Sequence, residues 1–358
     1  MEVVKEAINW LSSPEILFAL STLFCLFCLK MRFLWTTKAG IIYLVGFVVF
    51  FVASFQDPNF RIIVTKPDNV PIVLLFVFVG FFMWLSLKQA HENDELIEAG
   101  GEPREKAEYQ EKVLTWPHLV YAELICLVLM TVGLLLWSIL IHAPLEEPAN
   151  PAKTPNPSKA PWYFLGLQEM LVYYDPWIAG VVLPTLVIVG LMAIPYMDRN
   201  TKGSGYYTLK ERPFAITIFL FGFIVLWVVL IIIGTFLRGP NWNFYGPYEY
   251  WDSHKLEALV NVNLSEFIYV KWMGTGLPQF WLTREIWGFL IVGAFFLIPP
   301  PLLARTFFKD FYKQLGFARY SVMVVFFLFM LSLPAKMLLR WFFNLKYLVA
   351  IPEYFFNI

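Results

Sequence analysis

Long runs of apolar side chains with no polar face dominate this chain. A helix needs about 20 such residues to cross a bilayer, and inside lipid its backbone polar groups must all bond internally. We therefore predict an all-α fold, a polytopic membrane helical bundle of about eight transmembrane helices. The runs lie at Ile16 to Leu29, Ala39 to Phe55, Val70 to Leu87, Leu119 to Ile141, Trp177 to Met197, Phe214 to Leu237, Ile286 to Leu303 and Tyr320 to Leu339.

The first run is the shortest, and we expect it to need the residues from Leu11 to Glu15, or a locally thinner bilayer, to span. Composition excludes a soluble protein, because 59% of residues are apolar and 15% are charged. The net charge is zero, which gives no reason to expect nucleic acid as a partner. Cys25, Cys28 and Cys126 lie inside apolar runs and are interpreted as small hydrophobic residues.

Orientation follows from the loops, because Lys and Arg concentrate in short cytoplasmic loops of membrane proteins. The loops on the side of the charged segment 88–112 carry more of them than the loops on the other side. We therefore predict that segment 88–112 is cytoplasmic and that both termini are periplasmic.

The outer loop between the fourth and fifth runs changes character halfway. Five prolines predict an extended, ordered strap at 145–159: Pro144, Pro148, Pro151, Pro155 and Pro157. The next stretch, from Trp162 to Tyr174, is aromatic and apolar with helical spacing. It predicts a short interfacial helix that holds Trp162, Tyr163, Tyr173 and Tyr174 at headgroup depth and can cover a pocket for a lipid-soluble molecule. An aromatic belt without function is the alternative.

The stretch NPSKAPWYFLGLQE, which contains Pro161, Trp162 and Tyr163, resembles the loop that carries the Pro-Glu-Trp-Tyr motif of cytochrome b. The following apolar run resembles the next helix of the cytochrome b C-terminal domain, called subunit IV in b6f-type complexes. The resemblance covers roughly Pro117 to Leu237. It implies a quinol:cytochrome c oxidoreductase of the cytochrome bc type in a bacterial inner membrane, with extra N- and C-terminal helices in this chain.

In that family the loop closes over the quinol at the outer, Qo-type, oxidation pocket beside a Rieske iron–sulfur protein. One electron passes to the Rieske centre, the other passes to haem b, and the protons leave to the outside. The resemblance therefore implies a set of quinol-binding residues: Pro161, Trp162, Tyr163, Phe164 and Leu167.

The chain departs from the family at the catalytic carboxylate, because Pro161 stands where the family has its proton-accepting Glu. Quinol oxidation needs a proton acceptor within hydrogen-bonding reach. Glu169 is our first substitute and Asp175 our second, with Tyr163 as a catalytic hydrogen-bond donor to quinol or carboxylate. The alternative for Glu169 is a carboxylate paired with Lys153 or Lys159.

The histidines do not resemble the haem ligands of the family, and no metal site is expected. His118 and His142 are 24 residues apart, which is about 36 Å along a helix. We expect the chain alone to bind no haem, and we expect partners to carry the redox groups: a haem-bearing, b6-like cytochrome b, a Rieske 2Fe-2S protein and c-type cytochromes with haem c, in a complex that is dimeric in the family. His118 and Glu123 are candidates for an inner proton path.

Five segments describe the expected organisation. They are a three-helix extension (1–90), a charged connector (91–117), the subunit IV-like core (118–237), an aromatic periplasmic segment (238–285) and a two-helix extension (286–358). Two other functions stay open, namely a structural anchor for cytochromes without quinol chemistry and a transporter. The nearly charge-free runs and the lack of an internal repeat disfavour the transporter. The quinol is menaquinol or ubiquinol.

Overall fold

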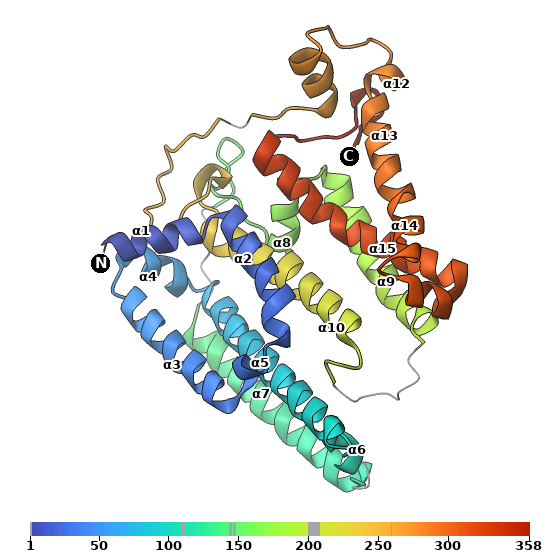
Figure 1. The fold of residues 1–358 in the computed structure, drawn as a ribbon. Coiled ribbons are helices and arrows are strands. Elements are labelled where there is room, and N and C mark those ends of the chain that lie inside the picture. Colours follow the sequence, from blue (N-terminus) through green and yellow to red (C-terminus); the bar gives the residue numbers. More distant parts are fainter. Residues whose placement is uncertain (1, 109–111, 143–144, 146–147, 200–207, 259) are drawn as a thin grey trace. The chain divides into compact units, whose positions relative to one another are not determined.

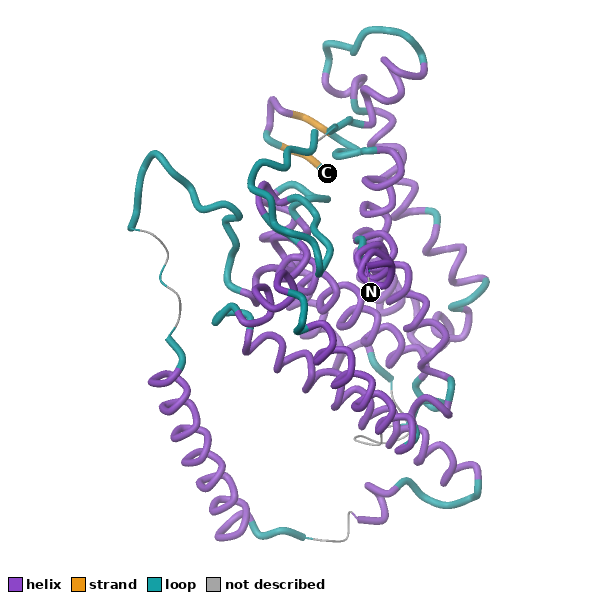
Figure 2. The backbone as a smooth tube through the Cα atoms, turned by 90° about the vertical axis from the view of Figure 1, so that its left-hand side faces the viewer, coloured by secondary structure: helices purple, strands orange, loops and turns teal. Residues whose placement is uncertain are grey.

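A computed structural model describes residues 2–108, 112–142, 145, 148–199, 208–258 and 260–358, so Pro144 of the predicted strap lies outside the described residues. Among these described residues, helices make up nearly all of the regular structure (Figures 1 and 2), and a short strand pair lies near the C-terminus. In the described part of the chain, seven helices are long and apolar enough to cross a membrane, or eight if one bent pair is a single span. The predicted all-α polytopic membrane bundle is confirmed.

The seven spans follow the apolar runs, with longer ends where the sequence continues to favour a helix. Lys, Glu, Gln and Ala sustain a helix past the apolar core, because their side chains lose little freedom there. The spans are Thr37–Ser54, Val70–Glu98, Thr115–Leu140, Ile178–Met197, Pro213–Leu237, Ile286–Arg305 and Lys309–Phe343.

The first apolar run is built differently from our expectation. Helix α1 (Glu2–Leu11) ends before it, and helix α2 (Pro14–Phe27) begins at a proline, with a bend of 73° between the two helical stretches. Proline is accommodated at a helix start, where its missing N–H leaves no bond unmade. Leu11 therefore does not extend the spanning helix, whereas Glu15 does belong to it.

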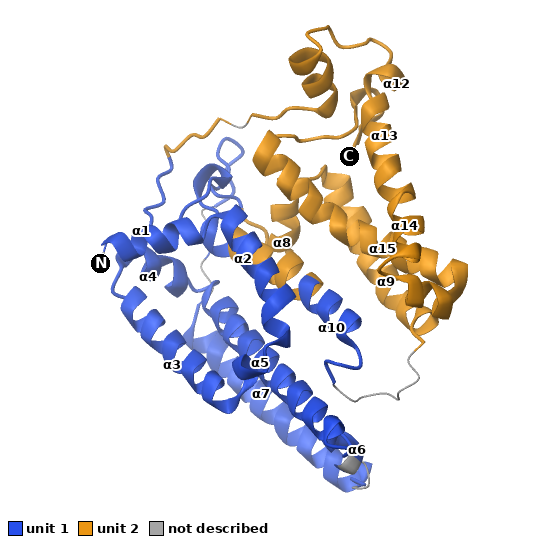
Figure 3. Ribbon diagram, viewed as in Figure 1, with its two compact units in different colours: residues 1–158, 203–221, 235–253 blue, residues 159–202, 222–234, 254–358 orange. Residues whose placement is uncertain are grey.

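The chain forms two compact units, each assembled from separate stretches (Figure 3). The first unit contains 1–158, 203–221 and 235–253, and the second contains 159–202, 222–234 and 254–358. Both units draw on the long span Pro213–Leu237.

The first unit joins the N-terminal helices to the outer loop after the long span. Its helices are α1, α2, α3 (Thr37–Ser54), α4 (Pro58–Thr65), α5 (Val70–Glu98), α6 (Arg104–Glu108), α7 (Val120–Leu140) and α10 (Pro213–Leu220). Asp57 caps α4 by accepting hydrogen bonds from the N–H groups of Asn59 and Phe60, and its carboxylate lies 2.7 Å from the ammonium group of Lys5. The hydroxyls of Ser54 and Tyr248 are also 2.7 Å apart. The Asp57 contacts tie α4 to α1, and the Ser54–Tyr248 contact ties loop 235–253 to the end of α3.

Helix α7 is an exception to the packing in that unit. None of its residues is buried, and the window that qualifies it as a span is 0% buried. A helix that is apolar on every side is stable only where lipid or another apolar surface surrounds it.

The second unit contains α8 (Trp162–Met170), α9 (Leu183–Met197), α11 (Val229–Ile232), α12 (Trp281–Arg284), α13 (Ile286–Leu297), α14 (Pro299–Arg305) and α15 (Lys309–Phe343). Helix α15 ends at Asn344, which adopts a left-handed conformation with φ of 53°. The chain then returns to an antiparallel pair, β1 (Ala350–Ile351) and β2 (Phe356–Asn357), with Ala350 opposite Asn357. Helix α13 packs so closely on this return that Gly288 leaves no room for a side chain beside the Leu348 carbonyl.

Candidate functional site

Helix α8 directly follows the proline-rich strap. Pro161 precedes its first residue, and the Phe164 N–H donates to the Pro161 carbonyl at 2.8 Å. The side chain of Gln168 reaches back one helix length and accepts a hydrogen bond from the Ala160 N–H at 2.8 Å. The residue directly after the strap is therefore held to α8 by a local side-chain contact. The helix ends at Met170, four residues earlier than the aromatic pattern predicted.

The two sides of α8 have opposite character. Tyr163 and Phe164 are 50% and 48% exposed, and their ring centroids lie 4.6 Å apart. Trp162 contacts Tyr163 edge to face at 5.9 Å. Pro161 is exposed and Leu167 is half-buried. Four of the predicted quinol-binding residues, Pro161 to Phe164, thus lie together at the start of α8, with two exposed aromatic rings, and Leu167 lies farther along the helix.

The other face of α8 packs on the segment that contains α11. Gly166 lies against Ile231, where an added Cβ would be 3.4 Å from the isoleucine side chain. At Gly234 an added Cβ would meet the Leu165 carbonyl oxygen at 3.0 Å, tighter than ordinary contact. Two glycines, one on each element, therefore set how closely α8 approaches its neighbour.

Glu169 lies on that buried face and has no exposed surface. The Tyr173 hydroxyl donates to its Oε1 at 3.5 Å. Six residues separate Tyr163 from Glu169, which turns the helix by about 600°, so the two side chains project on different sides. Proximity in sequence does not put this carboxylate beside the exposed aromatic rings.

The turn after α8 is buried instead of lying in an exposed aromatic belt. Tyr173 and Tyr174 are 1% and 3% exposed, so both side chains are packed inside the protein. Burial raises the pKa of Tyr174, whose hydroxyl lies 2.7 Å from the Ser332 hydroxyl of α15. Asp175 is half-buried and accepts hydrogen bonds from the Asn357 side chain at 3.1 Å and from the Trp177 N–H at 3.3 Å.

The C-terminal extension supplies three cations around this turn. Lys336 and Arg340 of α15 are 3% and 9% exposed. The Lys336 ammonium donates to the Lys346 carbonyl at 2.7 Å and lies 5.5 Å from the centre of the Tyr174 ring. Lys346 in turn donates to the Leu171 carbonyl at 3.0 Å. Burial, followed by the charge of Arg340, lowers the pKa of Lys346.

Sequence reasoning missed these three residues, because we assigned no chemistry to the last two helices. The available signal was the presence of Lys336 and Arg340 at the end of an apolar run, since ionisable groups in such runs are costly and take up specific partners. Tyr347 belongs to the same group, and burial followed by the charge of Asp175 raises its pKa.

The inner-path candidates lie elsewhere in the fold. His118 and Glu123 are exposed at the start of the span that contains α7.

The histidines give no pair suited to axial haem ligation. His91 is the buried one among the described histidines, and its Nε2 lies 3.0 Å from the Leu29 carbonyl. A carbonyl oxygen only accepts, so Nε2 donates and is not free to bind iron. His118 and His142 lie at opposite ends of one span, and both are exposed, as is His254. No step of the chemistry below is therefore assigned to a haem in this chain.

Comparison with known families agrees with the geometry of this region. Residues 148–248 match the family described as cytochrome b(C-terminal)/b6/petD. This stretch includes most of the strap, all of α8 and the long span Pro213–Leu237. No solved structure matches the chain. Residues 148–248 are therefore similar to the cytochrome b C-terminal family, and they lie in a longer chain with several helices able to cross a membrane.

Proposed function

We propose that the chain is a haem-free subunit of a bacterial cytochrome bc-type complex and forms part of its outer, Qo-type, quinol-oxidation pocket. One observation carries the proposal: α8 presents exposed Tyr163 and Phe164 at the end of the proline-rich strap, inside the segment that matches the family. A flat quinol head stacks well on aromatic rings at the edge of the membrane.

The redox groups are on partner subunits in this proposal. They are a b6-like cytochrome b with haem b, a Rieske 2Fe-2S protein and c-type cytochromes, in a dimeric complex of the inner membrane with both termini of this chain periplasmic. The unburied surface of α7 supports an obligatory partner, because a stable complex would cover part of it. Quinol, either menaquinol or ubiquinol, is the substrate.

Quinol oxidation releases two electrons and two protons. The electrons leave to the partner-held carriers, and this chain supplies the first proton acceptor and the walls that exclude water. Glu169 and Asp175 are the carboxylates of α8 and of the turn after it. Glu169 is kept from water beside the Tyr173 hydroxyl, and Asp175 is the more accessible of the two. Tyr163 offers a hydroxyl on the exposed face.

A structural anchor for cytochrome subunits is the second candidate. Its support is also specific, because Pro161 replaces the family's carboxylate and Glu169 projects away from the exposed rings. A structural anchor would retain the loop that leads into α8 but would lack the carboxylate that accepts the quinol proton.

The test is quinol oxidation by the purified native complex, measured at several pH values with and without an outer-site inhibitor such as stigmatellin. Glu169→Gln and Asp175→Asn are compared with Glu266→Gln, which neutralises a half-buried carboxylate on another segment of the same unit. We expect inhibitor-sensitive activity that falls at least roughly 100-fold in one of the two test variants, as for a lost general base.

The matched control keeps its activity, and all variants retain the subunits and haem spectrum of the complex. Full activity in both test variants removes these carboxylates from the mechanism. No inhibitor-sensitive activity in the native complex supports the anchor, and haem in the isolated chain contradicts a haem-free subunit.

A further inference from the structure

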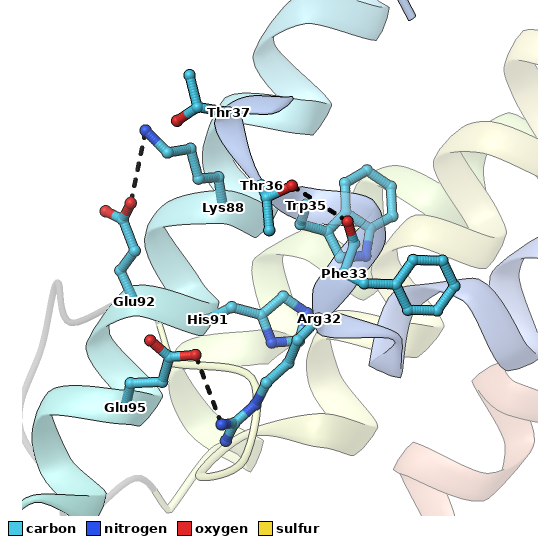
Figure 4. Close-up of a pocket in the computed structure, with 9 residues that line it drawn as sticks. All are labelled: Arg32, Phe33, Trp35, Thr36, Thr37, Lys88, His91, Glu92 and Glu95. Atoms are coloured by element: carbon cyan, nitrogen blue, oxygen red, sulfur yellow. Dashed lines mark hydrogen bonds and ion pairs between the residues drawn. The ribbon is translucent and has the colours of Figure 1, made fainter. Parts of the chain in front are cut away.

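A cavity of about 390 Å³ with several charged side chains in its walls lies in the first unit, far along the chain from α8. Its walls come from the short turn before α3 and from the last three turns of α5 (Figure 4). The lining residues are Arg32, Phe33, Trp35, Thr36, Thr37, Lys88, His91, Glu92 and Glu95. The family match does not include this part of the chain.

The cavity lies at the membrane surface. Thr37 is the first residue of one span, and Lys88 is the first charged residue after the apolar part of another. Phe33 is 68% exposed at the cavity edge, where an apolar side chain faces the lipid tails or headgroups. A ligand held here would lie at the depth of phospholipid headgroups.

The charges that line the cavity are balanced. Lys88 pairs with Glu92 at 3.5 Å. Arg32 pairs with Glu95 at 3.6 Å and more closely with Glu98, next to the cavity, at 2.9 Å. Figure 4 shows the two pairs one after the other along α5. Partly exposed ion pairs contribute little to stability, so a ligand can replace one partner of such a pair at small cost. Two cations and two carboxylates complement a zwitterion better than an ion of one sign.

His91 supplies the second, independent observation. It is 6% exposed, its Nε2 donates to the Leu29 carbonyl, and its buried Nδ1 has no hydrogen-bond partner. In the neutral ring that nitrogen is an acceptor. A buried acceptor without a partner costs free energy, and a ligand with an N–H group would remove that cost.

The anionic half of a ligand also finds complementary groups. The N-terminus of α3, an 18-residue helix, adjoins the cavity through Thr36 and Thr37. The N–H groups of a helix start favour a phosphate, and Lys88 and Arg32 add positive charge.

We propose that this cavity binds the headgroup of an aminophospholipid of the phosphatidylethanolamine type. The phosphate lies toward Lys88, Arg32 and the start of α3, and the ammonium donates hydrogen bonds to His91 Nδ1 and to Glu92 or Glu95. The acyl chains pass along Phe33. A choline headgroup lacks the N–H donors, and a glycerol headgroup lacks the positive charge.

The test is thermal unfolding of the delipidated full-length chain in detergent, titrated with dioleoyl-phosphatidylethanolamine. Parallel titrations use dioleoyl-phosphatidylcholine, dioleoyl-phosphatidylglycerol and free phosphoethanolamine. We expect a saturable rise in Tm with the first lipid alone. Lys88→Gln and His91→Gln each weaken its apparent affinity roughly tenfold, as the loss of one hydrogen bond or charge contact predicts.

Lys66→Gln is the matched control, because Lys66 forms an exposed ion pair with Asp68 outside the cavity. It leaves the titration unchanged. Lys88 is 24% exposed, whereas His91 is buried, so the Lys88 variant tests the site even where His91→Gln fails to fold. An equal rise with the choline lipid, or unchanged affinity in Lys88→Gln, overturns the proposal. An equal rise in Tm with free phosphoethanolamine would show that the cavity binds a soluble ligand, and it would contradict the proposal of a bound lipid.

Discussion

The ammonium group of Lys346 donates a hydrogen bond to the Leu171 carbonyl at 3.0 Å, across 175 positions of sequence. It makes a second, longer bond to the Val172 carbonyl at 3.3 Å. Through these bonds the segment after α15 holds the turn that follows α8. The C-terminal extension is thus part of the structure around the candidate site.

Removing this contact should loosen the turn. For Lys346→Gln we expect unfolding to become easier by about 1 to 2 kcal/mol, since the charged donor is lost and two carbonyls lose a partner. Thermal unfolding of the purified chain measures the effect. Lys313→Gln, which changes an exposed lysine of α15, is the control and leaves Tm unchanged. Equal Tm values for the two variants would contradict a stabilising role for Lys346.

Gly288 tests the packing of α13 on the C-terminal return. A Cβ at this position would overlap the Leu348 carbonyl oxygen, so Gly288→Ala requires the backbone to move. We expect a loss of about 1 to 3 kcal/mol, typical of overpacking. Gly293→Ala on the same helix is the matched control, because no atom lies within 4 Å of its Cβ position. Thermal unfolding of both variants measures the effect. A similar Tm for the two would show that the segment around Leu348 shifts without a loss of stability.

Gly234 tests the approach of α8 to its neighbour. Its alanine variant brings a Cβ to 3.0 Å from the Leu165 oxygen, which pushes α8 outward. We expect a loss of about 1 kcal/mol or more in stability and weaker quinol binding by the complex, seen as a raised KM. Gly180→Ala, with open space at its Cβ, serves as the comparison and keeps the KM of the wild type. A lower Tm without a change in KM would show that quinol binding does not depend on how closely α8 packs on its neighbour.

Asp57 predicts a pH dependence of stability. Burial alone raises the pKa of Asp57, but hydrogen bonds from Lys5, Phe60 and Asn59 outweigh it and hold the pKa below the ordinary value of 3.8. A carboxyl whose pKa is depressed by folding stabilises the protein above its unfolded pKa. That stability is lost as the pH falls through the lower, folded pKa.

Unfolding of the wild type and of Asp57→Asn is therefore compared between neutral pH and the acid range below about pH 4. The wild type should be more stable at neutral pH and lose that advantage on acidification. Asn still caps the helix, so the variant removes the titration and keeps most of the cap. Asp68→Asn, at a 50% exposed carboxylate, is the control. Parallel pH curves for wild type and Asp57→Asn would exclude this residue as the source.

Local patterns were enough to predict the spans and the existence of α8. A run such as Phe214 to Leu237 has one stable arrangement in a bilayer, a helix, whatever its neighbours are. The aromatic stretch after Pro161 likewise predicted a helix, although its end at Met170 depends on the buried turn that follows. The position of a single helix can therefore be predicted from residues that are neighbours in the sequence.

Non-local packing explains what could not be predicted. The orientation of Glu169 depends on which face of α8 meets α11, and glycines at 166 and 234 set that contact. The contribution of Lys346 depends on a pairing across the whole second unit. Residue spacing carries no information on such pairs, and so the sequence named Glu169 as a carboxylate of interest but not its burial.

The segment related to cytochrome b, 148–248, passes back and forth between the two compact units. A gene fragment cut at its ends would encode pieces of two cores and the whole of neither. Insertion, deletion or exchange of a gene segment at residues 148 and 248 is therefore disfavoured. The flanking helices and this segment are expected to be inherited together, as one unit of selection rather than as a module with removable additions.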